Sequence, residues 1–599
     1  MSKSNNQSKA SKEIQVLNDF EHILARPTIY VGSVKGSEEQ VPVLNDHGSI
    51  SSKPKMISVG MYKLFDEVFS NCVDEAKRMK TTMDSITIEI DSSTNMVSIK
   101  DSGEGFLNGS KKNQKSGLSN VETAVSMLRA GSNFNNDSIE ESLIGTNGMG
   151  VSLVNALSIV FEIETSNSKE TYSQRWENFI ASKPEVKSNR GKTGTRVSFI
   201  PRKEIFDGIK WDYQILKSTL SLKKRVLETE SKTSGIRIDF IWDGKKEEIL
   251  SSLKPDYSFK SNIGEMLIWK KSENSGTFSF VNSAICTGIH QKIVMDQINN
   301  ELGDSLGHHF YDHLIILNLP PGIVRFGDQN KTKFVSRRED VEGIILRSME
   351  PGILKFFKSD CFKEIKKLVD DRKRDSEIKK IRKEKKNVKL KFSHKYFPPT
   401  SNKAENLFIV EGLSAMGSIL QKRDPKKDGV YALKGKIKNA RSLEDLSGNR
   451  EIIELMQILN LDPEDNKSEG QFKNVVISTD QDPDGSHITS LLINLFYLWF
   501  PWVVQENRLY ILETPLVTTG ERSKKYYYSL EEFKKEASKE NLRNVRYLKG
   551  LGSLSLDDWD YVMKNRRIIS ITEDKKSAAS LEMAFGKSSE SRKKWLSQM

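Results

Sequence analysis

Acidic side chains are concentrated in residues 479–487, where Asp480, Asp482 and Asp484 alternate with other residues. The apolar run 474–478 comes just before and predicts a buried strand. In extended backbone, residues two apart point the same way, so the three carboxylates are expected on one side. Carboxylates this close repel one another unless a cation compensates, and all-oxygen ligands suit Mg²⁺. The stretch therefore predicts a magnesium site.

A further acid, Glu411, ends a second strand-like run, 406–410, and small residues then start a helix. Ligands of parallel α/β sheets bind beyond the carboxyl ends of the strands. Glu411 is therefore expected to share one acidic metal site with the Asp residues. The alternative interpretation of the Asp stretch is a solvated acidic turn of type I geometry.

Polar residues with helical spacing form a second group near the N-terminus. A helix is predicted over about residues 60–79, and Glu67, Asn71 and Asp74 fall on one face of it at i, i+4 and i+7. A carboxylate such as Glu67 can orient or deprotonate a water molecule, and the Asn71 amide offers an oxygen to a metal. This face predicts hydrolytic chemistry.

A predicted hairpin, 86–90 with 96–100, leads into Asp101, Gly103 and Gly105. Glycine lets the backbone approach a ligand closely, and a buried carboxylate can accept a hydrogen bond from an exocyclic amine. The glycine turn 145–150 then opens a helix, and the free amides of such a turn hold phosphates. Taken alone, its Gly-x-x-Gly-x-Gly pattern is also compatible with a plain loop.

Two further segments are less distinctive. Residues 193–195, Thr-Gly-Thr, precede a predicted strand, 196–200. Residues 328–333, Asp-Gln-Asn-Lys-Thr-Lys, are by themselves best interpreted as an exposed polar turn.

The whole chain has 599 residues, too many for one core, so about three domains are expected. Its three cysteines, Cys72, Cys286 and Cys361, are widely spaced and indicate a reducing interior. The first residues are rich in Ser, Asn and Lys and predict a disordered tail. The most apolar window, 491–504, is too short to span a bilayer. We expect a soluble cytoplasmic protein without a membrane segment.

Positive charge is concentrated in one segment. The chain has 93 Lys and Arg against 81 Asp and Glu, a net charge of +12, and residues 363–391 alone hold 14 basic and 6 acidic residues. A long solvated helix is one interpretation, with only a partial apolar stripe for packing. A nucleic-acid partner is the other, because basic residues gain affinity by neutralising phosphates. The acidic metal site favours DNA.

The C-terminal motifs resemble the Toprim module of type IIA DNA topoisomerases. The matching runs are residues 411–418, 433–439, 480–487 and 546–552, in that order. The resemblance implies Mg²⁺ bound by Glu411, Asp480, Asp482 and Asp484, with Glu411, Asp480 and Asp482 catalytic, and DNA contacts from Lys434, Lys436 and Asn439. Two positions depart from the family pattern: Leu413 replaces a common Asp, and Ser553 replaces a usual Glu.

The N-terminal motifs come in the order of a GHKL (Bergerat) ATPase domain, and residues 328–333 resemble the Gln-Thr-Lys loop of the transducer domain that follows it. The resemblance implies Glu67 as general base, Asn71 as a Mg²⁺ ligand, Asp101 at the adenine amine, and Lys331 at the γ-phosphate as a second catalytic group. The ATP-binding residues it implies are Asn71, Asp101, Gly103, Gly105, Ser132, Asn133, Gly145, Thr146, Asn147, Gly148, Met149, Gly150, Thr195, Gln329, Asn330 and Lys331. Ile144 stands where the family usually has glycine.

These resemblances imply an α/β multidomain chain. The expected domains are a disordered tail (1–19), a GHKL ATPase sandwich (20–203), a ribosomal S5-like transducer domain with a basic C-terminal helix (204–397), and a Rossmann-like Toprim domain (398–599). The C-terminal sequence, residues 549–598, most resembles the large subunits of T-even phage topoisomerases.

The expected function is that of the ATP- and Mg²⁺-binding subunit of a type II DNA topoisomerase, which passes one duplex through a transient break in another. The expected partners are double-stranded DNA, a breakage-reunion subunit that carries the active-site tyrosine, and a second copy of this chain, bound through the ATPase domain when ATP is present. An ATP-switched Toprim nuclease is the alternative. A GHKL clamp of the chaperone or mismatch-repair kind is disfavoured, because a clamp needs no second metal site.

Overall fold

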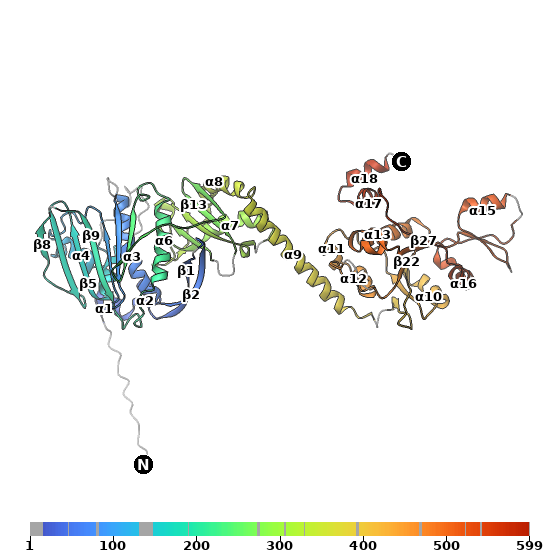
Figure 1. Ribbon diagram of the computed structural model, residues 1–599, viewed down its shortest axis with the longest axis horizontal. Coiled ribbons are helices and arrows are strands. Elements are labelled where there is room, and N and C mark those ends of the chain that lie inside the picture. The colour runs from blue at the N-terminus through green and yellow to red at the C-terminus, as the bar shows by residue number, and fades with distance from the viewer. Residues whose placement is uncertain are drawn as a thin grey trace, which may run out of the picture. The chain divides into compact units, whose positions relative to one another are not determined.

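The computed structural model describes residues 16–597 except 46, 79–82, 131–147, 190, 272–275, 305–306, 329, 391–393, 466–469, 522 and 539–541. The chain divides into two compact units, Met1–Val369 and Asp370–Met599 (Figure 1). The N-terminal unit begins with α1 (Asp19–Ala25) and α2 (Pro27–Val31). Asn18 and Asp19, which the sequence prediction leaves in the tail, start α1: the Asn18 side chain caps it by accepting from the Glu21 N–H.

A nine-stranded sheet forms the centre of the N-terminal unit, in the order β11-β10-β3-β4-β9-β5-β6-β7, with β8 paired to β6. Its strands are β3 (Ser85–Asp91), β4 (Met96–Asp101), β5 (Ser158–Ser166), β6 (Glu170–Glu177), β7 (Ile180–Ala181), β8 (Glu185–Ser188), β9 (Gly194–Pro201), β10 (Arg237–Trp242) and β11 (Lys245–Ile249). β10 pairs in parallel with β3, so the chain on both sides of residue 203 contributes to one sheet. The domain boundary near residue 203 stays a prediction.

Helices pack on this sheet and supply its core. They are α3 (Val59–Arg78), α4 (Asn120–Ser126), α5 (Gly150–Ala156) and α6 (Tyr213–Leu227), and β1 (Ser37–Leu44) pairs with β2 (Ile50–Ile57) beside α6. The predicted helix over 60–79 is confirmed as α3. Its apolar residues recur at helical spacing from Met61 to Ala76 and are buried, which leaves the Glu67 and Asn71 face for the site.

A five-stranded sheet in the order β12-β13-β17-β14-β15 forms the rest of the unit. Its strands are β12 (Tyr257–Ser261), β13 (Gly264–Lys270), β14 (Phe278–Val281), β15 (Ala284–Ile285) and β17 (Tyr311–Leu317). Helices α7 (Ile289–Leu302) and α8 (Arg338–Phe356) pack against each other, and α8 also packs on β12. The short strands β16 (Thr287–Gly288) and β18 (Lys333–Phe334) pair with each other and fix the end of the 328–333 loop.

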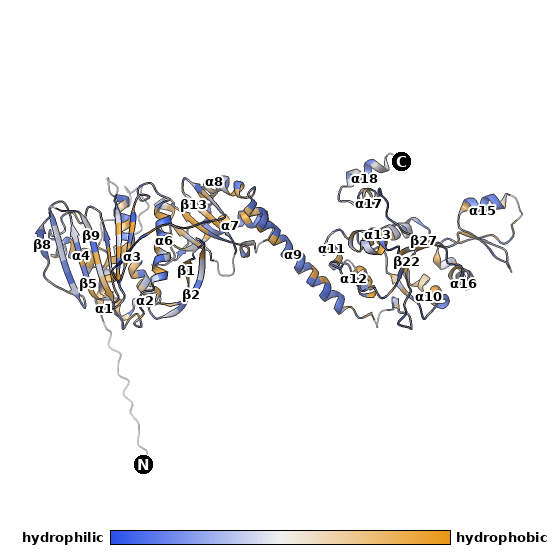
Figure 2. Cartoon of the chain, viewed as in Figure 1, coloured by the Kyte–Doolittle hydropathy of each residue, from blue (hydrophilic) through white to orange (hydrophobic). Residues whose placement is uncertain are grey.

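The basic segment is helical, as α9 (Asp360–Asn387). It is mostly hydrophilic (Figure 2). Ile365 and Val369 are fully buried in the core of the N-terminal unit, Ile378 and Ile381 are also buried, and Leu368 is exposed. Residues 370–376 are exposed throughout. The apolar stripe of α9 is thus a packing surface at both ends of the helix and is absent in its middle.

The C-terminal unit is built on a six-stranded sheet in the order β19-β21-β20-β22-β23-β27. Its strands are β19 (Tyr396–Phe397), β20 (Asn406–Glu411), β21 (Asp428–Leu433), β22 (Asn474–Ser478), β23 (Leu509–Leu512) and β27 (Ile568–Ser570). The four central strands are parallel. Alternate residues of β20 enter two separate cores, Leu407 and Ile409 one and Phe408 and Val410 the other, because both faces of the sheet are covered.

Helices α10 (Gly412–Lys422), α11 (Leu443–Ser447), α12 (Arg450–Ile458), α13 (Pro483–Trp499), α14 (Pro501–Gln505) and α16 (Leu556–Lys564) complete this unit around the sheet. A small sheet of β24 (Val517–Thr519), β25 (Lys525–Tyr527) and β26 (Arg546–Tyr547) carries α15 (Leu530–Ala537), and α17 (Ser577–Phe585) and α18 (Ser589–Leu596) follow. Within the described part of the chain, no helix combines the length and apolar character needed to cross a membrane.

Candidate nucleotide and metal sites

Glu67 lies on the face of α3 that the apolar core leaves uncovered, and it is held from two sides. Its Oε1 is 2.8 Å from the Lys63 Nζ, one helical turn earlier. Its Oε2 faces Gly150, the first residue of α5, so closely that a methyl group built on Gly150 would lie 2.1 Å from that oxygen. Any side chain at position 150 would therefore displace the carboxylate. Asn71, one turn further along α3, is exposed.

The Asp101 carboxylate lies at the end of β4 and is 6% exposed. Its Oδ1 accepts hydrogen bonds from the Gly103 N–H (2.8 Å) and the Thr195 N–H (3.1 Å). Burial raises the pKa of Asp101 to about 6, and these amides oppose that effect. The Cys72 thiol also lies beside Asp101, and burial raises its pKa well above the ordinary value. One carboxylate oxygen is thus fixed by backbone, which is suited to orienting the other toward a ligand.

Gly105 is held in the left-handed region, with φ +72°, where a Cβ would lie 2.3 Å from the Ser166 carbonyl oxygen. The next residue, Phe106, donates its N–H to the Thr165 Oγ1 at 2.9 Å. That hydroxyl is also 3.0 Å from the Thr195 Oγ1. Thr165, which the sequence analysis did not select, therefore joins the Asp-x-Gly-x-Gly segment to β9.

Only the end of the glycine turn is described. Gly148 has φ +60°, and Met149 occupies the N-cap position of α5 without a side-chain cap. The predicted ATP-binding residues Ser132, Asn133, Gly145, Thr146, Asn147 and Gln329 lie outside the described residues, as does Ile144. Their roles stay predictions.

The 328–333 loop places Lys331 beside Glu67. Burial lowers the pKa of Lys331, while the carboxylates of Glu67, Asp74 and Asp66 oppose that shift. Asn330 joins the loop to the N-terminal arm: in the orientation that satisfies its amide, it donates to the Tyr30 carbonyl (3.2 Å) and accepts from the Gly32 N–H (3.1 Å). The tertiary fold thus brings the loop to the base candidate, although loop and helix are far apart in the sequence.

In the C-terminal unit, Glu411 ends β20 and Asp480 follows β22, the neighbouring parallel strand. Burial raises the pKa of Glu411, and the charges of Asp480, Asp482 and Asp484 raise it further. The Glu411 Oε2 is buried and has no hydrogen-bond partner in the structure. Asp480 accepts from the Leu551 N–H at 2.7 Å, which brings the 546–552 run to the acidic end of the sheet.

The other two acids do not continue an extended strand, which corrects the extended backbone expected for this stretch. α13 begins at Pro483, so Asp482 is its N-cap and accepts from the Gly485 N–H at 2.7 Å. Asp484 lies in the first turn of α13 and pairs with the Lys436 Nζ at 2.8 Å. This hydrogen bond lowers the pKa of Asp484. The start of a helix rather than strand periodicity therefore positions Asp482 and Asp484.

The predicted four-carboxylate cluster is therefore not assembled as a closed ligand set. Among the described residues, no three His, Cys, Asp or Glu side chains are grouped as a metal site. Glu411 and Asp480 nevertheless fit a divalent cation, because an unpartnered buried carboxylate oxygen beside further negative charge lacks what a cation supplies.

The predicted DNA-contact residues differ in their exposure and in the contacts that they already make. Lys434 is exposed, whereas Lys436 is paired with Asp484. Asn439 is used structurally: its Nδ2 donates to the Phe585 carbonyl at 2.9 Å, and its Oδ1 accepts from Asn494 at 3.1 Å. At the departures from the family pattern, Leu413 is 57% exposed and the Ser553 hydroxyl donates to the Gly550 carbonyl.

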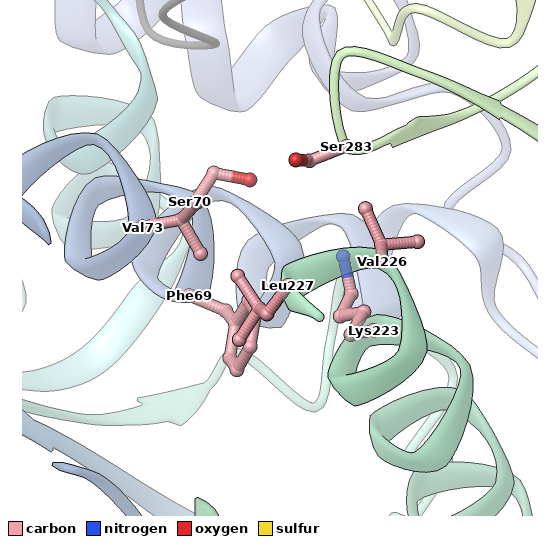
Figure 3. A pocket seen from close by; sticks show the side chains of 7 residues that line it. All are labelled: Phe69, Ser70, Val73, Lys223, Val226, Leu227 and Ser283. Carbon is pink, nitrogen blue, oxygen red and sulfur yellow. The ribbon is translucent and has the colours of Figure 1, made fainter. Parts of the chain in front are cut away.

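A cavity lies between α3 and α6 and is also lined by Ser283 (Figure 3). It is lined mainly by apolar groups and has room for about one water molecule, so it is not a nucleotide site. Cys72, Cys286 and Cys361 are buried and free.

Comparisons with known proteins identify the class of the chain. The model of the Toprim domain matches residues 406–514, and that of the C-terminal associated domain of TOPRIM matches residues 512–599. One of the subunits of DNA topoisomerase 4 from Mycoplasma pneumoniae is 26% identical over 99% of this chain and 98% of its own length. DNA topoisomerase 2 of Arabidopsis thaliana is 28% identical over 97% of this chain, which spans 43% of that longer protein.

Among solved structures, the ATPase region of Saccharomyces cerevisiae topoisomerase II matches with a TM-score of 0.50 and 25% identity, over 60% of this chain and all of that one. The predicted α/β multidomain fold class is thereby confirmed, as a topoisomerase II ATPase and transducer region followed by a Toprim domain. With this domain set along its length, the chain is an ATPase/Toprim subunit of a type II DNA topoisomerase.

Proposed function

We propose that this subunit binds and hydrolyses ATP and binds Mg²⁺ in order to pass one DNA duplex through a transient double-strand break in another. The observation that supports it most is the presence of two separate polar sites in one chain. One consists of Glu67, Asp101 and Lys331 in the N-terminal unit, and the other is the Glu411 and Asp480 pair of the C-terminal unit.

In the nucleotide site, Asp101 accepts the adenine amine through the oxygen that the Gly103 and Thr195 amides leave available. Glu67 orients the attacking water and takes its proton, held at the right place by Lys63 and Gly150. Asn71 is the metal-binding amide on the same face of α3, and Lys331 stabilises charge at the γ-phosphate. Hydrolysis then biases the Asp328–Lys333 loop between two positions, and the transducer sheet senses the change.

In the Toprim site, Glu411 and Asp480 would hold the metal, and Lys434 would contact the DNA backbone. A Mg²⁺ bound there supplies charge stabilisation at the scissile phosphate. Asp482 and Asp484 are the further candidate ligands, and each already uses its Oδ1 in the structure, Asp482 as the cap of α13 and Asp484 in the pair with Lys436.

The proposed partners are double-stranded DNA, a breakage-reunion subunit that bears the tyrosine, and a second copy of this chain bound through the ATPase domain. The Mycoplasma pneumoniae relative is by its name one of the subunits of topoisomerase 4, which supports the second of these. A special relation to phage enzymes remains a proposal that rests on the C-terminal sequence and Ser553.

A cleavage-trapping assay tests the proposal. The chain is mixed with a breakage-reunion subunit and catenated DNA, each subunit is tagged separately, and covalent complexes are resolved on a denaturing gel. ATP-dependent decatenation is expected, with DNA attached to the partner. Metal-dependent nicking by this chain alone, or DNA attached covalently to it, would favour the Toprim nuclease instead.

Glu67→Ala should abolish hydrolysis and leave nucleotide binding largely intact.

A further inference from the structure

Lys63 is a buried cation that directly contacts the proposed catalytic base. Its side chain is 11% exposed and that of Glu67 is 19% exposed, and the two charged groups are 2.8 Å apart. Although burial lowers the pKa of Lys63, Glu67 and Asp66 raise it above the ordinary value. The cation therefore stays charged in its pocket, which is the state that can hold a carboxylate.

The two oxygens of Glu67 have different neighbours. Oε1 contacts Lys63, and Oε2 faces the α-carbon of Gly150 at the start of α5. A glutamate side chain on a helix surface ordinarily samples several rotamers, at an entropic cost when one is selected. The contact with Lys63 at one oxygen and the close backbone at the other restrict Glu67 to one orientation. Of these two contacts, the one with Lys63 is made by a side chain and the one with Gly150 by backbone.

Lys63 is itself held by neighbours. Asp66 lies 3.8 Å from the Lys63 Nζ and forms an ion pair with Lys223 of α6. Although burial raises the pKa of Asp66, Lys223 and Lys63 lower it below the ordinary value. The Lys223 Nζ also lies 5.1 Å from the ring centroid of Phe69, a residue of α3. Figure 3 shows Lys223 and Val226 of α6 beside Phe69 and Ser70 of α3.

α6 also contacts both layers of the N-terminal unit. Leu216 and Leu220 belong to the core beneath the nine-stranded sheet, whereas Leu222 and Val226 pack with Leu267 and other residues of the five-stranded sheet. The ion pairs Lys223–Asp66 and Lys63–Glu67 thus form a connected series of charges from α6 to the base.

We propose that Lys63 is a positioning residue for ATP hydrolysis, which orients Glu67 toward the attacking water and is held in turn by Asp66 and Lys223. The proposal rests on the role of Glu67 given above. Lys63 does not contact nucleotide in this assignment, so it acts on the rate of hydrolysis and not on binding. A misplaced catalytic group costs on the order of 10²-fold in rate, which sets the size of the expected effect.

The test compares Lys63→Met and Lys63→Arg in the full chain. Lys63→Met is expected to lower kcat for ATP by about 10- to 100-fold, with the dissociation constant of a non-hydrolysable ATP analogue within about 3-fold of wild type. Lys63→Arg keeps a cation that can pair with Glu67, so its kcat should lie closer to wild type than that of Lys63→Met. Lys217→Met is the matched control, because it removes a lysine–glutamate pair with Glu247 of β11. Thermal melting checks that each variant is folded.

The charged groups around the pair supply a second variant. They are Asp66 on the same helix, Lys223 on α6, and Asp328 and Lys331 of the loop. Asp66→Asn removes the acid that lies between Lys63 and Lys223 and should lower kcat by a smaller factor than Lys63→Met does.

The variants test the role of Glu67 as the base and the role of Lys63 as its positioning residue separately. If Glu67→Ala hydrolyses ATP at the wild-type rate, the proposed base is wrong. If Glu67→Ala is inactive while Lys63→Met keeps wild-type kcat, the positioning role is wrong. A weakened dissociation constant with unchanged kcat would make Lys63 a phosphate contact and would also overturn the proposal. If Lys63→Met fails to fold, Asp66→Asn decides, since a wild-type kcat in that variant contradicts the series.

Discussion

The Asp101 carboxylate accepts a hydrogen bond from the Thr195 backbone N–H at 3.1 Å, across a separation of 94 residues. A glycine precedes Thr195 because β9 approaches closely here: a Cβ on Gly194 would lie 2.2 Å from the Asp101 carbonyl oxygen. Asp101, the residue proposed to contact adenine, is therefore held between two strands, β4 and β9. The position of its second carboxylate oxygen depends on both strands.

Nucleotide affinity should fall in acid because of Asp101. The pKa of this carboxyl is raised to about 6 by burial, and only the ionised form accepts the adenine amine. Between pH 8 and pH 5, the affinity for an ATP analogue should fall by about tenfold, as expected for titration of one group with that pKa. Asp101→Asn should bind more weakly at pH 8 and lose this component of the pH dependence. Equal slopes for variant and wild type would contradict the assignment.

Protonation of Asp101 should have the opposite effect on stability: it should stabilise the N-terminal unit. The folded-state pKa of about 6 lies above that of an unfolded Asp, about 3.9. The folded form therefore binds more protons between these values, and the contribution of Asp101 to the free energy of unfolding falls as pH rises from about 4 to 6. Denaturant unfolding of wild type and Asp101→Asn measures it, and the difference between them should change across this range and be constant above it.

Lys331→Ala should slow ATP turnover without changing DNA affinity. Lys331 lies in the charged cluster around Glu67, and DNA contacts are assigned elsewhere. A fall in kcat of at least about tenfold is expected for loss of a cation at the developing phosphate charge. Lys333→Ala, two residues further along the loop, is the control. Altered filter binding of DNA by Lys331→Ala, with normal ATP turnover, would reverse the assignment.

Glu411→Ala and Asp480→Ala should separate the two sites. Loss of a metal carboxylate should lower strand cleavage with the partner by about 10²- to 10³-fold, since metal charge stabilisation amounts to several kcal/mol. Intrinsic ATPase activity should survive, because these residues belong to a different compact unit from the nucleotide pocket. Glu506→Ala, an exposed acid after α14, serves as the control. Loss of ATPase activity in either variant would contradict the separation.

The basic residues of α9 should divide into two groups. Arg382 pairs with Asp462 and Glu464 at 2.8 and 3.0 Å, so Arg382→Ala should chiefly reduce stability, by at most about 1 kcal/mol at its half-exposed site. Neutralising Lys379, Lys380 and Lys383, which are exposed, should lower DNA affinity and flatten its salt dependence. An unchanged salt slope in the triple variant would leave α9 as a solvated packing helix.

Local sequence patterns predict the helices and strands that carry the candidate site residues. The apolar spacing in α3 predicts that Glu67 and Asn71 share one face of the helix, and the apolar runs before Glu411 and Asp480 predict neighbouring parallel strands, because burial of one face or both leaves a periodic trace in the chain. The ordered motifs then predicted the fold class that the comparisons confirmed.

Only the tertiary structure decided how distant residues meet. The Leu551 N–H on Asp480 and the Lys331 loop beside Glu67 join segments whose separation no local pattern encodes, since sheet pairing and core packing bring them together. The tertiary structure also decided whether the backbone at Asp482 and Asp484 continues as a strand or starts a helix. Pro483 and the capping side chain of Asp482 favour a helix start over continued extension, so Asp482 and Asp484 are positioned by the first turn of α13 and not by strand periodicity.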